Sequence, residues 1–174
     1  MGSIKPGVGN EASDPSSSRR SLYLIDIENL CGGPFHPRAR RILGFFLLQS
    51  EWRNGDISYL AANHALLAQL AWEIQEMRCR IHARGGRDGA DQALLADAPS
   101  DRVVERFDRV VIGSGDGIFA ALAEHARSAG VEVEVVARPR HLSTRLALAA
   151  DRAVPIASTW SEYRTWASSR GRAA

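Results

Sequence analysis

One apolar run breaks into glycines around a single carboxylate: Val110-Val111-Ile112-Gly113-Ser114-Gly115-Asp116-Gly117-Ile118-Phe119. A short apolar run bounded by glycine is typical of a strand buried on both faces, and apolar residues at helical spacing follow from Ile118 to Arg127. The stretch therefore predicts a strand, a tight turn and a helix. In open α/β folds this arrangement places the turn, here with Asp116, at the carboxyl edge of the sheet.

A second stretch has the same pattern. The apolar run Leu22-Tyr23-Leu24-Ile25 is followed by Asp26-Ile27-Glu28-Asn29 and then by the break Cys31-Gly32-Gly33-Pro34. If the two strands are parallel and adjacent, Asp26 and Asp116 lie side by side, and their repulsion is costly unless a cation is bound. The alternative is that each Asp only caps the helix that follows it.

The composition is that of a globular protein with one domain. The chain has 174 residues, of which 45% are hydrophobic and 24% charged, and no apolar segment approaches the ~20 residues of a membrane helix. Two cysteines are too few for a disulfide framework, and the N-terminus lacks the apolar core of a secretory signal, so we expect a cytoplasmic protein without membrane association. The expected organisation is a flexible tail at 1–20, a domain at 21–157, and a C-terminal helix and tail at 158–174.

Strand and helix patterns alternate along the domain. The pattern predicts a mainly parallel sheet with helices on both faces, which is a Rossmann-like three-layer α/β fold. Valine and glutamate alternate at 131–136, which indicates an edge-like strand, and Trp160, Tyr163 and Trp166 mark a C-terminal helix. Strands are expected at 22–27, 57–62, 78–83, from 110, at 131–136 and at 154–156; helices are expected at 36–49, 64–77, 90–98, 118–127 and 143–150.

A third acidic cluster lies between the two strand ends. Asp88 is in a glycine-rich loop, Asp91 is in the first turn of the helix expected at 90–98, and Asp97 follows on another face of that helix. Asp91 is therefore the stronger ligand candidate, although its charge would also complement the helix dipole. Three carboxylates with little sulfur or imidazole nearby favour Mg²⁺ or Mn²⁺ over zinc, and such sites usually act on phosphate.

The positive charge is almost wholly arginine, with Lys5 as the sole lysine and a formal net charge of +2. Arginine binds phosphate in bidentate fashion. Clustered arginines flank one helix start and occupy one basic loop, where they would form a phosphate track beside the acids or, alternatively, a solvated face. The five candidates for binding RNA are Arg38, Arg40, Arg41, Arg138 and Arg140.

Four pieces of the chain, in order, resemble the NYN domain, a branch of the PIN-like nuclease superfamily, over roughly 22–156. They are Leu24-Ile25-Asp26-Ile27-Glu28-Asn29-Leu30, Asp88-Gly89-Ala90-Asp91, Gly113 to Phe119, and Gly130-Val131-Glu132-Val133 with the helix that follows it up to Asp151. The resemblance implies a PIN-like fold and a metal-dependent endoribonuclease that hydrolyses RNA phosphodiester bonds at a Mg²⁺ or Mn²⁺ site. It implies single-stranded or structured RNA as the partner and leaves a homodimer open. The implied catalytic positions are Asp26, Asn29, Asp91 and Asp116, with the three aspartates as metal ligands; secondary candidates are Glu28, Asp88, Asp97 and Ser114.

One position departs from the family pattern. Many members carry Gly-Asp-Ser-Asp-Phe at this turn, whereas here Ile118 occupies the place of the second Asp. The main alternative is therefore a non-catalytic RNA-binding or scaffolding protein with a weakened site.

Two further alternatives fit less well. A dinucleotide-binding turn would bring Asp116 against the pyrophosphate, and a haloacid dehalogenase phosphatase would carry Asp, not Glu28, two residues after its nucleophile.

Overall fold

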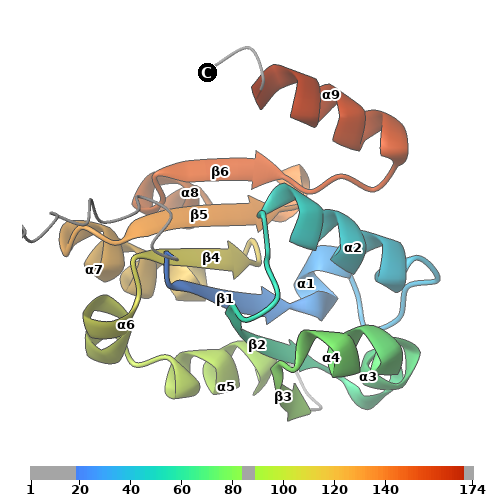
Figure 1. The fold of residues 1–174 in the computed structure, drawn as a ribbon, viewed down its shortest axis with the longest axis horizontal. Coiled ribbons are helices and arrows are strands. Elements are labelled where there is room, and N and C mark those ends of the chain that lie inside the picture. Colours follow the sequence, from blue (N-terminus) through green and yellow to red (C-terminus); the bar gives the residue numbers. More distant parts are fainter. Residues whose placement is uncertain (1–18, 84–88, 171–174) are drawn as a thin grey trace, which may run out of the picture.

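The computed structural model describes residues 19–83 and 89–170. Within these ranges the strands form one sheet in which every neighbouring pair is parallel, in the order β3-β2-β1-β4-β5-β6. All strands therefore end at the same edge (Figure 1). Their bounds are β1 (Ser21–Asp26), β2 (Ile57–Ala62), β3 (Arg80–Ala83), β4 (Arg109–Gly113), β5 (Glu132–Ala137) and β6 (Arg152–Pro155).

Helices cover both faces of the sheet, as the alternating pattern predicts. One face packs against α1 (Ile27–Cys31), α2 (Ala39–Gln49), α3 (His64–Gln69) and α4 (Ala71–Met77). The other packs against α5 (Gly89–Asp97), α6 (Ser100–Arg106), α7 (Ala120–Ser128) and α8 (Thr144–Ala149). The 3-10 turns η1 (Gly117–Phe119) and η2 (Pro139–His141) precede α7 and α8, and α9 (Trp160–Arg170) ends the described chain.

The central strand β1 is buried along its whole length because it has neighbours on both sides and helices on both faces. Leu22 and Leu24 belong to the core under α5 to α8, whereas Tyr23 and Ile25 belong to the core under α1 to α4. This alternation follows from the two-residue period of a strand. β1 and β4 are adjacent and parallel, which is the condition on which the expected proximity of Asp26 and Asp116 depended.

The expected helices at 36–49, 64–77 and 118–127 were wrong in detail. The first begins only at Ala39, after Pro37, and the second is divided at Leu70 into α3 and α4. The third starts as the 3-10 turn η1 and becomes α-helical at Ala120. The short helices α1 and α6 were not predicted, because neither has enough residues for a clear hydrophobic period.

The expected edge-like strand at 131–136 was also wrong. β5 lies between β4 and β6, and Glu134 is fully buried rather than exposed. The glutamate is tolerated because Arg109 and Arg152 both donate hydrogen bonds to its Oε2. Alternating valine and glutamate in this strand therefore reflects a buried ion network and not a solvated face.

The C-terminal helix predicted from its aromatic residues is α9, which lies beside α2 and β6 (Figure 1). The ring of Phe45 stacks on Tyr163 at 5.7 Å and meets Trp160 edge-on at 5.1 Å between centroids. None of the residues of α9 is fully buried. The aromatic side chains therefore attach the helix to α2 without making it part of the central core.

Three further expectations concern the chain as a whole. The expected tail at 1–20 lies outside the described residues up to 18. No helix among the described residues is long and apolar enough to cross a membrane. Cys31 and Cys79 are both free thiols, as predicted from their number.

Candidate active site

Asp26 is the last residue of β1, and the alternation of side chains along the strand determines the face on which its carboxyl group lies. It continues the Leu22 and Leu24 face, toward α5, and only 4% of its surface is exposed. Asp26 is also the N-cap of α1, because its Oδ1 accepts a hydrogen bond from the backbone N–H of Asn29 at 3.1 Å. The capping alternative considered from the sequence is therefore correct for this residue, and it does not compete with a role in a site.

The end of β4 is tied to the end of β1 by polar contacts. The buried hydroxyl of Ser114 donates to Asp26 Oδ2 at 3.4 Å and accepts from the backbone N–H of Asp116 at 3.2 Å. The amide oxygen of Asn29 accepts from the backbone N–H of Gly115 at 2.8 Å. The structure thus brings Asp26, Asn29 and Ser114 together at one sheet edge.

Asp91, in the first turn of α5, is the carboxyl group that hydrogen-bonds to Asp26. Asp91 is 7% exposed, so two carboxyl groups are buried against one another. Burial, the hydrogen bond to Asp91 and the charge of Asp91 raise the pKa of Asp26 to about 8, from a usual value of 3.8. The pair therefore holds a proton at neutral pH in the absence of a cation.

Asp116 is engaged differently from the sequence prediction. Its Oδ1 accepts a hydrogen bond from the backbone N–H of Ile118 at 3.0 Å, which caps η1. Ser114 lies between it and Asp26, so the contact expected between Asp26 and Asp116 is replaced by the Asp26–Asp91 pair. Asp116 is partly exposed at the same edge, next to the pair rather than within it.

Some of the secondary candidate residues have structural roles, and one contacts the site. Glu28 Oε1 accepts from the backbone N–H of Asn63 at 2.9 Å, which fixes the end of β2. Asp97 is paired with Arg80 and His82 of β3, at 2.8 and 2.9 Å, near the far end of α5. Asp88 lies outside the described residues. Among the three candidates that the structure describes, Ser114 is the one that hydrogen-bonds to Asp26.

The carboxyl groups at this edge are oxygen ligands of the kind that a divalent cation prefers. Within residues 19–83 and 89–170, no group of three or more His, Cys, Asp or Glu side chains is arranged to hold a metal ion. Asp26 and Asp91 nevertheless fit Mg²⁺ or Mn²⁺, because these ions often bind through one or two carboxylates and retain several waters. Two buried acids that share a proton also gain from exchanging it for a cation.

The five candidate arginines lie in three settings. Arg40 pairs with Glu73 of α4 at 2.9 Å, and Arg41 is exposed on α2. Arg38, Arg138 and Arg140 line a groove of about 880 Å³ beneath α9. The sequence predicted these three residues as RNA-binding candidates, but it gave no sign of the groove, because Trp166 reaches the groove from a helix far along the chain.

A close backbone approach keeps the β4 turn in place. A Cβ atom on Gly115 would lie 2.3 Å from the carbonyl oxygen of His141, and Ser143 donates its backbone N–H to the Gly115 carbonyl at 2.8 Å. Glycine at this position thus lets the loop after β5 pack directly on the turn that carries Asp116.

Gly115→Ala is expected to destabilise the protein by about 1–3 kcal/mol, because the added methyl group meets backbone atoms that cannot move alone. The free energy of unfolding in urea measures this. Gly44→Ala is the control, since its Cβ would meet no atom within 4 Å and alanine favours the α2 helix. Equal stability of the two variants would contradict the proposed packing.

The comparisons with known proteins identify the family. The model of the NYN domain matches residues 24–157, which includes every strand of the sheet except the first residues of β1. The chain belongs to the NYN domain family. This NYN domain is a PIN-like α/β domain, as the resemblance of its motifs implied, and NYN domains are in general ribonucleases.

Solved structures support the fold. A protein of unknown function from Vibrio parahaemolyticus is similar to this NYN domain with a TM-score of 0.57 and 19% identity, over 82% of this chain and 96% of that one. Glucose dehydrogenase from Haloferax mediterranei, in complex with NADP, Zn and gluconolactone, reaches 0.43 with 12% identity, over 88% and 41% of the two chains. The Vibrio structure shows the same fold, and the dehydrogenase adds nothing to that conclusion. No curated protein matches the chain significantly.

Proposed function

We propose that this NYN domain is a metal-dependent endoribonuclease that hydrolyses RNA at a Mg²⁺ or Mn²⁺ site on Asp26 and Asp91. The observation that carries the proposal is the hydrogen-bonded pair of buried carboxyl groups at the carboxyl edge of the sheet. Buried like charges are costly, and a divalent cation relieves that cost while binding phosphate oxygens. The family of the chain supports an RNA substrate.

The residues around the pair have distinct proposed roles. A bound cation would polarise the phosphate and lower the pKa of a bound water. Asn29 fixes the turn by accepting from the Gly115 N–H, and its amide nitrogen would donate to a phosphate oxygen. Asp116 uses Oδ1 to cap η1, which leaves Oδ2 to accept a proton from water or to bind the cation's hydration shell. Ser114 holds Asp26 in position.

Cleavage of a labelled single-stranded RNA, with Mn²⁺, Mg²⁺ or EDTA, tests the proposal. We expect cleavage with either ion and none in EDTA. Asp91→Asn should reduce the rate by at least about 100-fold, because even residues that only support metal ligands contribute 10- to 100-fold. Asp97→Asn is the matched control on the same helix, since Asp97 pairs with β3, and it should retain the parent rate. Equal rates for the two variants would refute the site.

The second candidate is a non-catalytic RNA-binding protein, as considered from the sequence. Two observations favour it: Ile118 replaces a family carboxylate, and the described residues show no group of three metal-binding side chains. RNA binding without cleavage in any divalent cation would establish this alternative.

For the cellular location we propose the cytoplasm, whose reducing conditions suit the free thiols of Cys31 and Cys79.

Ile118→Asp is expected to raise the affinity for Mn²⁺ in the free protein by about tenfold, because it adds a charged oxygen ligand two residues after Asp116. Ile118 is 36% exposed on η1, so the change removes little core packing. Isothermal titration calorimetry measures the affinity, with Ile118→Asn as the uncharged control. Equal affinity in both variants would mean that residue 118 does not reach the site.

A further inference from the structure

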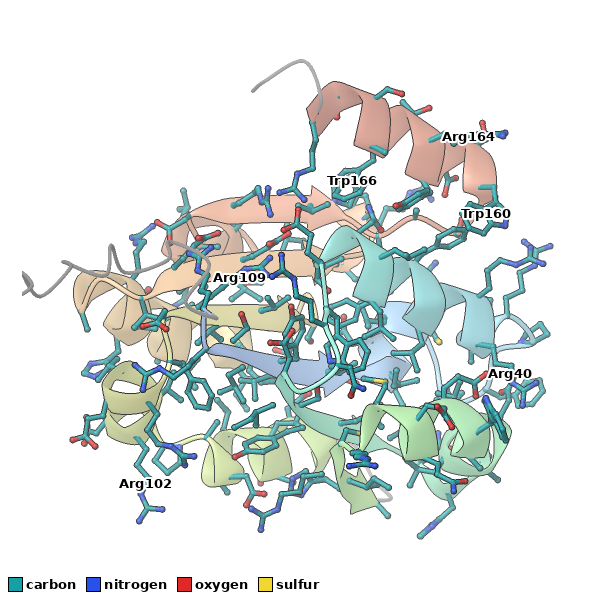
Figure 2. All side chains as sticks on the ribbon, in the orientation of Figure 1. Arg40, Arg102, Arg109, Trp160, Arg164 and Trp166 are labelled. Atoms are coloured by element: carbon teal, nitrogen blue, oxygen red, sulfur yellow. The ribbon has the colours of Figure 1, made fainter. Side chains whose placement is uncertain are left out.

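The groove beneath α9 has an apolar floor and a basic rim. It lies between α2, α9 and the chain segments that follow β5 and β6, and its volume is about 880 Å³. Ile42, Ile156 and Trp166 contribute apolar lining, and Figure 2 shows Trp166 between α9 and β6. This volume is within the range of about 300–1,000 Å³ that is usual for ligand pockets.

The charges at the rim are not neutralised within the groove. Arg38, Arg138 and Arg140 line it, and in the part of the chain that the structure describes none of the three pairs with a carboxylate. Glu162 is the acidic residue of the lining, and hydrogen bonds from the backbone and hydroxyl of Ser158 lower its pKa, so its single negative charge stands against the three arginines. The groove is therefore complementary to an anionic ligand that also carries apolar faces.

One end of the groove borders the acidic edge. Leu30, in the groove lining, directly follows Asn29, and Arg138 donates from Nη1 to the carbonyl of Cys31 at 2.6 Å. The loop that carries Arg140 continues to His141, whose carbonyl packs on Gly115. A ligand in the groove thus lies across α1 from the Asp26–Asp91 pair.

We infer that this groove binds a single-stranded segment of the RNA, with a base against Trp166 and phosphates on Arg38 and Arg140. The inference rests on the proposed function for the choice of RNA. Aromatic rings combined with a basic rim are the general means of holding unpaired strands, because every base has a face that can stack and every linkage a charge. A duplex keeps its bases stacked inside and cannot offer one to Trp166.

Fluorescence anisotropy of a labelled oligouridine, titrated with the full chain in EDTA, tests the groove without cleavage. Arg38→Gln and Arg140→Gln should each weaken binding about three- to tenfold and flatten the slope of log affinity against log salt by about 0.7. Arg41→Gln is the matched control, because Arg41 has the same charge on the same helix but does not line the groove. Equal effects from all three variants would overturn the inference.

Variants of Trp166 distinguish the contribution of base stacking to RNA binding from that of charge. Trp166→Ala should weaken binding about tenfold with an unchanged salt slope, and Trp166→Phe should restore most of the affinity. Melting of both variants shows whether α9 remains attached. Duplex RNA of the same length should bind weakly, and tight duplex binding or full affinity of a folded Trp166→Ala variant would overturn the inference.

The outcomes separate this inference from the nuclease proposal. A chain that binds the oligouridine through Arg38, Arg140 and Trp166 but cleaves no RNA would retain the groove and exclude the nuclease. A chain that cleaves RNA with unchanged affinity in all groove variants would retain the nuclease and exclude the groove. If the chain binds neither RNA nor single-stranded DNA, the groove is not a nucleic-acid site.

Discussion

Asp26→Asn is expected to abolish RNA cleavage and to stabilise the metal-free protein above neutral pH. Asparagine keeps the shape of Asp26 and can still cap α1, because its Oδ1 can accept from the Asn29 N–H. It removes a negative charge from the buried pair with Asp91 and, with it, a ligand for the cation. The rate should fall by at least about 100-fold, as argued for Asp91→Asn.

The pH dependence of stability follows from the direction of the pKa shift. The pKa of Asp26 in the folded protein, about 8, is above its usual value of 3.8, so the folded state holds a proton that the unfolded state has lost. The contribution of Asp26 to the stability of the metal-free parent is then greatest below pH 4 and decreases as the pH rises toward 8. Asp26→Asn should lose this dependence.

Thermal melting in EDTA at several pH values measures the effect on stability. The melting temperature of Asp26→Asn should exceed that of the parent at pH 8 and approach it near pH 4, with each kcal/mol worth about 2–4 °C for a domain of this size. If the melting temperatures of the parent and of Asp26→Asn change with pH in the same way, Asp26 and Asp91 are not buried together.

Glu134→Leu is expected to be the most destabilising single change, at about 3–5 kcal/mol, because it leaves a buried arginine without its partner. Arg109 is 5% exposed and donates to Glu134 and, at 3.0 Å, to the carbonyl of Ser50. Arg152 donates to the same carboxylate at 2.6 Å. Urea unfolding of the variant measures the loss.

Two further variants define the cause. Glu132→Gln, on the same strand, removes a glutamate with a partly exposed side chain 3.9 Å from Arg109, and it should cost less than about 1 kcal/mol. The double variant Glu134→Leu/Arg109→Met removes both buried charges and should recover part of the loss. If Glu134→Leu cost no more than Glu132→Gln, the network would have no role in stability.

The parallel sheet and its acidic edge followed from local patterns. Val110 to Ile112 and Leu22 to Ile25 are apolar without interruption, which only a strand covered on both faces needs. Because both strands end in glycine or aspartate, the sequence also placed Asp26 and Asp116 at one sheet edge. Asp91 followed from its place in the first turn of its helix, and the family resemblance assigned both Asn29 and Asp91 to catalytic positions.

The features that the sequence did not predict depend on contacts between distant parts of the chain. The pairing of Asp26 with Asp91 requires the side-chain direction of β1 and the position of α5 together. The strand that carries Glu134 was predicted to be edge-like because the arginine partners of Glu134 come from strands 25 and 18 residues away. Trp166 reaches the groove only because α9 returns to α2.

We propose above that Asp26 and Asp91 hold a divalent cation. The most direct measurement is the anomalous scattering of Mn²⁺ in crystals of the full chain grown with the ion and a non-cleavable RNA. We predict an anomalous peak in direct contact with Asp26 and Asp91 and close to Asp116, and its loss in Asp26→Asn. A peak elsewhere, or no peak under conditions in which the same protein cleaves RNA, would contradict the account.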